Sequence, residues 1–156
     1  MWKPEEEGIT HINAYSKSRT VLGKMLSNFY YTPFECEDGK FQSIEGYWYW
    51  LLTPEDNEQR EYLRKLYGYQ AKEYGRSIYT QDWPSHNDLI FQNKIKRAIF
   101  NKIKTNQKIH KEFLLNRLPI VHYYCYGTKV IVPEKGQWIW DYLNEFVDLL
   151  KKQDEV

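Results

Sequence analysis

The sequence has few of the residues that cross-link a small protein or hold a cofactor. Its two cysteines, Cys36 and Cys125, are too few for a disulfide framework, and neither has the spacing of a metal ligand. A glycine-rich phosphate loop, a cluster of cysteine and histidine residues and a Gly-x-Ser-x-Gly nucleophile elbow are also missing from the sequence. We therefore expect neither a metal nor an organic cofactor.

Long apolar stretches are missing as well. No segment approaches the length of a membrane span, and the start of the chain, Met1 to Glu7, has no apolar region of the kind that signal peptides contain. We therefore expect a soluble, intracellular protein of the cytoplasm that does not enter a membrane. The length fits a single domain over residues 1–156, with its core at about residues 9–150.

The overall charge is close to zero, because 22 Lys and Arg residues against 21 Asp and Glu residues give +1. This balance argues against a protein that binds polyanions over its whole surface. Residues 91–117 are nevertheless strongly basic, with Glu112 as their only acidic residue. Their cations are Lys94, Lys96, Arg97, Lys102, Lys104, Lys108, Lys111 and Arg117. Such a stretch either attracts phosphates or nucleic acid or, more commonly, is the solvated face of a helix.

Hydrophobic spacing predicts an α+β protein in which helices dominate. Helices are expected at residues 44–52, 53–67, 69–74, 86–104, 108–116 and 138–151. Ser43, Thr53 and Ser85 are the expected N-caps. Residues 9–42 look irregular or weakly stranded, and residues 119–132 predict a hairpin. The first of the expected helices is apolar almost all round, which predicts that it is buried.

Aromatic residues are unusually abundant, with 14 Tyr, 7 Phe and 6 Trp. Most of them are expected in the core, and a remainder would suit a pocket that holds a planar base. The four histidines, His11, His86, His110 and His122, are scattered along the chain. We expect them at the surface or as hydrogen-bonded core residues rather than as catalysts.

Two polar features stand out in apolar surroundings. Ser27 and Asn28 lie between Leu26 and Phe29, and so place hydroxyl and amide groups beside an apolar wall. Glu45 lies inside the apolar helix that follows. Its carboxylate is either desolvated, which raises the pKa and suits proton transfer near neutral pH, or exposed at the helix start, where the helix dipole favours it. Position alone favours neither interpretation.

Three blocks of residues recur together in a known family. The first combines Leu26-Ser-Asn-Phe29 with Ser43-x-Glu45-x-Tyr47, the second is Ala71-Lys72-x-x-Gly75-Arg76, and the third is Asp82-Trp83. The basic helix that follows, at residues 95–102, also fits. These blocks resemble the NADAR/YbiA-like family over about residues 12–110, and the first block is the most specific because it joins several residue types at fixed spacing.

The resemblance implies an N-glycosidase. Cleavage of an N-glycosidic bond builds positive charge on the sugar C1, which a carboxylate stabilises. Glu45 is expected in that role and as the general base. Lys72 is expected to hold a phosphate or carbonyl, to act in proton transfer, or to form a Schiff base with the ring-opened sugar. Asp82 is expected to act as a second carboxylate or to orient Lys72. The resemblance also implies a set of substrate-binding residues, which comprises Lys17, Ser27, Asn28, Phe29, Tyr47, Arg76 and Trp83.

Each of these binding residues has a chemical reason. Lys17 and Arg76 carry the positive charge that a phosphate requires, and Asn28 offers an amide to ribose hydroxyls. The rings of Phe29, Tyr47 and Trp83 would stack on a base or shape the pocket.

The sequence departs from the family at two places. Gly46 replaces the His that follows the glutamate, and the C-terminal third lacks the Asp near a Trp-Gly pair that the family usually carries. The substrate implied first is ADP-ribose on guanine in single-stranded DNA. A ribosylaminopyrimidine phosphate of riboflavin biosynthesis and non-catalytic binding of ADP-ribose or nucleic acid are the alternatives. No obligate protein partner is expected, and a toxin–antitoxin or bacteriophage role rests on analogy alone.

Overall fold

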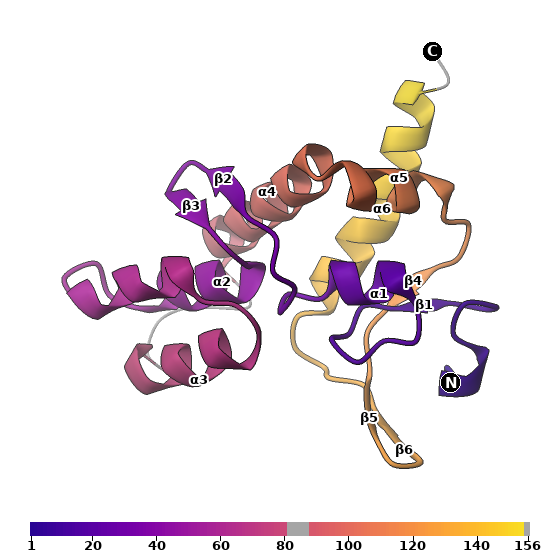
Figure 1. Cartoon of the computed structure of the whole chain (residues 1–156), viewed down its shortest axis with the longest axis horizontal. Coiled ribbons are helices and arrows are strands. Elements are labelled where there is room, and N and C mark those ends of the chain that lie inside the picture. Colours follow the sequence, from indigo (N-terminus) through magenta and orange to yellow (C-terminus); the bar gives the residue numbers. More distant parts are fainter. Residues whose placement is uncertain (81–87, 155–156) are drawn as a thin grey trace. The chain divides into compact units, whose positions relative to one another are not determined.

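The computed structural model describes residues 1–80 and 88–154, and its contacts divide the chain into two compact units. The first unit joins Met1–Ser27 to Gln107–Val156, and the second is Asn28–Asn106. Helices dominate both units and the strands are short (Figure 1), so the predicted α+β class is confirmed. A single domain over residues 1–156 stays a prediction.

The first unit is built around a short parallel pairing of two strands that lie far apart in the sequence. β1 (Ile12–Asn13) pairs with β4 (Ile120–Val121), and the short helix η1 (Pro4–Glu6) precedes them. Three helices pack against this pairing and one another, namely α1 (Val21–Leu26), α5 (Gln107–Leu115) and α6 (Gln137–Asp154). The predicted hairpin is confirmed in part, because β5 (Tyr124–Tyr126) and β6 (Lys129–Ile131) are antiparallel while residues 120–121 pair with β1 instead.

Buried polar groups of the first unit bond to one another. Tyr123 is the centre of this group: its hydroxyl bonds to Nε2 of His11 at 2.6 Å, and its backbone N–H donates to Oδ1 of Asn13 at 3.0 Å. His122 bonds through Nδ1 to the carbonyl oxygen of Ala14 at 2.7 Å. His11 and His122 are therefore hydrogen-bonded structural residues, as expected, whereas His86 lies outside the described residues.

The second unit packs helices around one buried helix. That helix is α2 (Ile44–Leu52), and its neighbours are the hairpin β2 (Phe34–Cys36)–β3 (Gly39–Phe41), the 3₁₀ helix η2 (Glu58–Lys65), α3 (Gly68–Ile78) and α4 (Leu89–Thr105). Ile44, Tyr47 and Phe41 are fully buried. The predicted buried helix 44–52 with Ser43 as its N-cap is confirmed, since Ser43 Oγ accepts from the Gly46 N–H at 3.0 Å.

Other boundaries differ from the prediction for local reasons. Thr53 ends α2 instead of starting the next helix, because its hydroxyl donates to the Tyr49 carbonyl at 2.7 Å and its N–H bonds back to Trp50. The helix expected over residues 53–67 is therefore a 3₁₀ helix that begins only at residue 58, after an Asn57 cap. α3 also runs through Gly75, where we expected it to end.

One helix was not predicted, and the start of α4 differs from the prediction. The stretch 9–42 contains a helix that the prediction missed, and the Thr20 hydroxyl caps it by accepting from the Gly23 N–H. Asp88 caps α4, which begins at Leu89, while the expected cap Ser85 lies outside the described residues. The predicted helices 108–116 and 138–151 are confirmed to within a few residues.

None of the helices in residues 1–80 and 88–154 is long and apolar enough to cross a membrane.

Gly75 sets the distance between α2 and α3. A Cβ atom at this position would lie 2.2 Å from Cγ of Tyr49 on α2, so the two helices are in contact where α3 has no side chain. Overpacking of this kind costs about 1–3 kcal/mol. We expect Gly75→Ala to lower the free energy of unfolding by that amount, although alanine is the better helix former.

Chemical denaturation monitored by far-UV circular dichroism measures this change. Gln70→Ala, an exposed substitution on the same helix, is the control and should be close to neutral. An unchanged or raised stability of Gly75→Ala would contradict the close packing of α2 and α3.

Candidate active site

Glu45 lies in the first turn of α2, and its backbone is held from two sides. Its N–H donates to the carbonyl oxygen of Asn28 at 2.9 Å. Next to it, the Ser43 hydroxyl caps the helix and donates to the Leu66 carbonyl at 2.9 Å. The loop before β2 and the end of η2 therefore both hold the start of α2, which gives Glu45 a defined position.

Burial raises the pKa of Glu45 to about 7. Glu45 is half-buried, and the burial of its carboxyl outweighs the positive charges of Lys72 and Arg76, which act on its pKa in the opposite direction. Of the two positions considered for Glu45, the structure has the desolvated one. A carboxyl with a pKa near 7 exchanges a proton readily at neutral pH.

α3 supplies the cations that act on Glu45. Lys72 and Arg76 are four residues apart and so share one face of the helix. Arg76 is exposed and hydrogen-bonds to the hydroxyl of Tyr49, which raises the pKa of Arg76. Tyr49 is itself four residues after Glu45 on α2, and its pKa is raised by burial and by the charge of Glu45. Glu45, Tyr49, Lys72 and Arg76 thus form one interacting group, here called the Glu45 cluster.

The loop of residues 28–32 joins this cluster to the rest of the second unit. Besides the bond from Asn28 to Glu45, the carbonyl of Phe29 accepts from the N–H of Gly68 at the start of α3, at 2.9 Å. Thr32 accepts from Nδ2 of Asn106 at the end of α4, at 3.3 Å. One short loop therefore contacts the starts of α2 and α3 and the end of α4.

Gly46 has no room for the histidine that the family carries at this position. A Cβ atom on Gly46 would lie 2.6 Å from the carbonyl oxygen of Leu63 in η2. Backbone at this distance does not yield as a flexible side chain does. The backbone of η2 therefore fills the space that the side chain of a histidine at position 46 would need.

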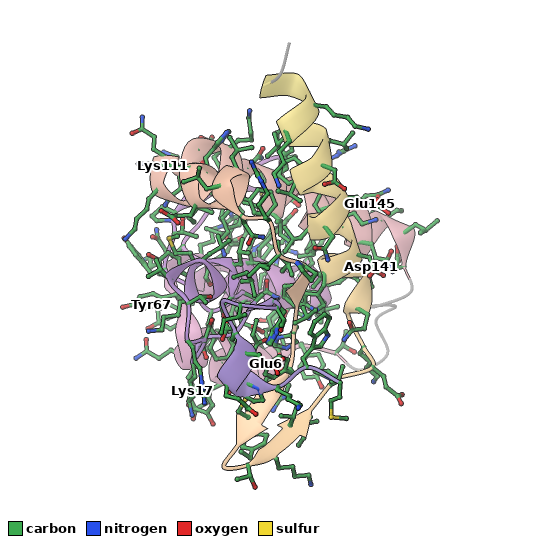
Figure 2. All side chains as sticks on the ribbon, turned by 90° about the vertical axis from the view of Figure 1, so that its right-hand side faces the viewer. Glu6, Lys17, Tyr67, Lys111, Asp141 and Glu145 are labelled. Atoms are coloured by element: carbon green, nitrogen blue, oxygen red, sulfur yellow. The ribbon has the colours of Figure 1, made fainter. Side chains whose placement is uncertain are left out.

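The predicted substrate-binding residues fall into three groups. Asn28, Phe29 and Arg76 belong to the second unit together with Glu45 and Lys72, and the bond from Asn28 ties the loop directly to Glu45. Lys17 and Ser27 belong to the first unit, where Lys17 is exposed (Figure 2) and Ser27 is buried at the end of α1. Asp82 and Trp83 lie outside the described residues.

Tyr47 needs a correction. Its ring is fully buried against Phe34, Phe41 and Trp50, and its hydroxyl donates to Oδ2 of Asp38 at 2.7 Å. A ring that stacks on a base must be exposed, so the prediction that Tyr47 stacks on substrate is wrong for this structure, while a role in shaping the pocket stays a prediction. Tyr49 was not among the predicted site residues, although its helical spacing from Glu45 identifies it.

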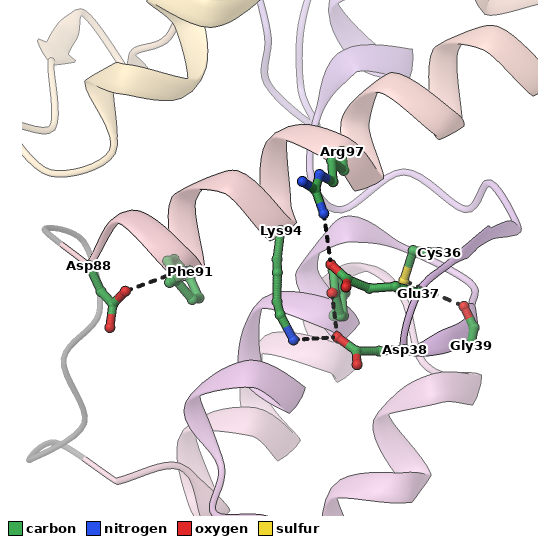
Figure 3. Close-up of polar contacts among 9 residues, drawn as sticks. Cys36, Glu37, Asp38, Gly39, Asp88, Phe91, Lys94 and Arg97 are labelled. Carbon is green, nitrogen blue, oxygen red and sulfur yellow. Dashed lines mark hydrogen bonds and ion pairs between the residues drawn. The ribbon is translucent and has the colours of Figure 1, made fainter.

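The basic stretch of α4 is less available to phosphate than its composition indicates. Lys94 pairs with Asp38 at 3.2 Å and Arg97 pairs with Glu37 at 3.6 Å (Figure 3). Lys102 is buried, with 2% of its surface exposed, and its Nζ lies 5.9 Å from the centre of the Tyr30 ring. The prediction that all the α4 lysines lie on the solvated face is therefore wrong for Lys102.

The burial of Lys102 changes the pKa of its amine, and the spacing of the sequence indicates that burial. Burial lowers the pKa of its amine to about 7. Lys102 follows the buried Ile95 and Ile99 by seven and three residues, and so shares their face of the helix. That spacing could have identified it as buried. Elsewhere, no group of three or more His, Cys, Asp or Glu residues within residues 1–80 and 88–154 could hold a metal ion.

Comparison with known structures identifies the fold. The NMR structure of the E. coli protein YbiA matches with a TM-score of 0.66 at 17% sequence identity, over 99% of this chain and 89% of that chain. The fold is YbiA-like. No family model matches the chain, and no curated protein matches it. The YbiA-like fold agrees with the resemblance found in the sequence blocks, while the activity belongs to the proposal that follows.

The raised pKa of Glu45 predicts a pH-dependent stability. Because the pKa in the folded protein, about 7, exceeds the ordinary glutamate value of 4.5, the contribution of the protonated carboxyl is complete below about pH 4.5 and is lost as the pH rises through about 7. Glu45→Gln keeps the shape and removes the titration. We expect this variant to gain on the order of 1–3 kcal/mol over the wild type between pH 5 and pH 8.

Urea denaturation of both proteins at the two pH values measures this gain. Glu73→Gln, which removes an exposed carboxylate on α3, is the control and should follow the wild type at both pH values. A constant difference between Glu45→Gln and the wild type would show that Glu45 titrates like a solvated glutamate.

Proposed function

We propose that this protein is an N-glycosidase that removes ADP-ribose from a modified base, with guanine in DNA as the first candidate. The observation that carries the proposal is the Glu45 carboxyl, with a pKa of about 7, within the electrostatic influence of the positive charges of Lys72 and Arg76. N-glycoside hydrolysis requires a carboxylate near the sugar C1 and a positive group for the phosphates of the substrate. The YbiA-like fold and the sequence blocks are further support.

In the proposed reaction, the bond from C1 to the base nitrogen breaks and its electron pair leaves with the nitrogen. Ionised Glu45 stabilises the positive charge that develops on C1. It then accepts a proton from the water that attacks C1, and the departing nitrogen takes up a proton, so that one water molecule is added across the bond. Arg76 and Lys72 bind phosphate oxygens, Arg76 through the fork of its guanidinium. The Asn28 amide bonds to ribose hydroxyls. Lys72 has a second proposed role, in which its amine forms a Schiff base with the ring-opened sugar.

A second candidate substrate is a ribosylaminopyrimidine phosphate. The observation that favours it concerns the basic stretch of α4. There, Lys94 and Arg97 form ion pairs with acidic residues, and Lys102 is buried. A small phosphate ester needs only one or two cations, and Lys72 and Arg76 meet that need within the Glu45 cluster. The salt dependence of binding separates the two candidates, since several phosphate contacts give a steep slope and one or two give a shallow slope.

Turnover of guanine-ADP-ribosylated single-stranded DNA tests the proposal. We expect the wild type to release ADP-ribose, and kcat/KM to rise with pH through about 7 because the base must be ionised. Glu45→Gln should lower kcat by about 10²–10⁴-fold, the usual effect of losing a general base. Lys72→Ala should raise KM if Lys72 only binds phosphate, and abolish kcat if it forms a Schiff base.

Two exposed residues provide matched controls. Glu73→Gln and Lys65→Ala remove the same charges from positions at the surface of α3 and η2, and should leave turnover unchanged. No release by the wild type, with the ribosylaminopyrimidine phosphate turned over instead, would replace the first substrate with the second. Binding of ADP-ribose without turnover of either would contradict the glycosidase proposal.

A further inference from the structure

Four tyrosines of the second unit expose about half or more of their surface. The exposed fractions are 53% for Tyr31, 51% for Tyr62, 48% for Tyr67 and 66% for Tyr69. Tyrosine usually places its ring against protein and only its hydroxyl in water. Exposed rings gathered on a small region of a folded protein therefore indicate a binding surface.

Two of these residues, Tyr67 and Tyr69, lie at the start of α3, and Tyr31 reaches that start from the loop before β2. The rings of Tyr31 and Tyr67 contact each other, with their centres 4.9 Å apart and their planes at 64°. Tyr67 is the residue before α3, and its ring lies at the surface (Figure 2). Tyr69 lies in the first turn of α3. These three residues are here called the tyrosine surface.

The tyrosine surface lies next to the Glu45 cluster. Tyr69 precedes Lys72 by three residues and Arg76 by seven, so the three side chains share one face of α3. At 1.5 Å per residue, that face extends about 10 Å from Tyr69 to Arg76. Lys72 and Arg76 are also the two cations whose charges act on Glu45. One face of α3 therefore leads from the exposed Tyr69 ring to the positive charges of Lys72 and Arg76, which act on the Glu45 carboxyl.

We propose that the tyrosine surface binds a single-stranded nucleic acid by stacking its bases beside the nucleotide that reaches Glu45. Rows of exposed aromatic rings with nearby cations are the usual platform for single strands, since the rings take bases of any sequence and the cations take phosphates. A small metabolite with one base would use one ring, whereas this surface offers three. The assignment of the strand as the substrate of Glu45 rests on the proposed function, but the binding itself does not.

Tyr62 provides a matched control. Its exposed fraction is close to that of Tyr31, and its ring likewise packs edge-on against a second tyrosine, Tyr74, with the centres 5.0 Å apart. Tyr74 follows Tyr69 by five residues, which places it about 140° around the helix from the proposed surface. The Tyr74 hydroxyl also donates to the Gln59 carbonyl at 3.1 Å. This pair thus lies on another flank of α3 and should not contact the strand.

The experiment measures binding of fluorescently labelled oligodeoxythymidine and oligouridine by anisotropy at two salt concentrations. We expect Tyr67→Ala and Tyr69→Ala each to weaken binding by about 5- to 150-fold, the effect of about 1–3 kcal/mol for one stacked base. Tyr67→Trp should bind at least as well as the wild type, and Tyr62→Ala should bind like it. Thermal unfolding of each variant checks that the fold is intact.

Several results would overturn the proposal. One is that neither oligonucleotide binds the wild type, and another is that Tyr62→Ala weakens binding as much as Tyr67→Ala. If the same alanine variants instead convert a dimer to a monomer in sedimentation experiments, the surface joins two copies of the chain. Strand binding that depends on these tyrosines without any turnover would support the surface while contradicting the glycosidase proposal. Turnover of the DNA substrate that does not depend on these tyrosines would support the glycosidase proposal while contradicting the tyrosine surface as a strand-binding site.

Discussion

The close packing of α2 by η2 on one side and α3 on the other is the constraint on which the rest of the second unit depends. It exists because two residues lack side chains. Gly46 lets the Leu63 carbonyl of η2 lie against α2, and Gly75 lets α3 lie against the Tyr49 ring. With a Cβ at either position the helices would have to move apart. The carboxyl of Glu45 would then be more solvated, and the cations of α3 would be farther from it.

This packing keeps Glu45 in a compromise between two electrostatic effects. Burial favours the neutral carboxyl, while Lys72 and Arg76 favour the ionised one, and the result is a pKa of about 7. Such a group lowers the free energy of unfolding at neutral pH, because the carboxyl is then ionised, although desolvated, in a fraction of the molecules. Groups of this kind cluster at functional sites, where the same desolvation makes proton transfer efficient. The raised pKa of Glu45 therefore supports the proposal that the Glu45 cluster is an active site.

Sequence reasoning predicted the parts of this arrangement that depend on local spacing. The apolar helix with its Ser43 cap and the position of Glu45 inside it were readable from residues 43–52, and the α+β class followed from the same periodicity. Thr53 was misassigned because Thr-Pro is a good helix start locally, while the bond from its hydroxyl to Tyr49 is visible only in the folded chain. Lys102 was placed with the other lysines by its charge, although its spacing from Ile95 and Ile99 indicated the buried face.

Contacts between distant segments could not be predicted from the sequence. Nothing in the residues around Asn28 indicates that its carbonyl accepts from Glu45, or that Phe29 and Thr32 contact the ends of two other helices. The contact of Leu63 with Gly46 also requires the path of η2, which the sequence analysis had as an α-helix. The residues of the site could be proposed from the chain, but the reason why Glu45 is desolvated could be found only in the packing around it.

The most direct test of this account is the titration of Glu45 itself, followed by the chemical shift of its side-chain carboxyl carbon in the ¹³C NMR spectrum. The account predicts a pKa of about 7 in the wild type, and a still higher pKa in Lys72→Met, because that substitution removes a positive charge that favours ionisation. A pKa near 4.5 that Lys72→Met leaves unchanged would contradict it, since Glu45 would then be a solvated helix-start glutamate.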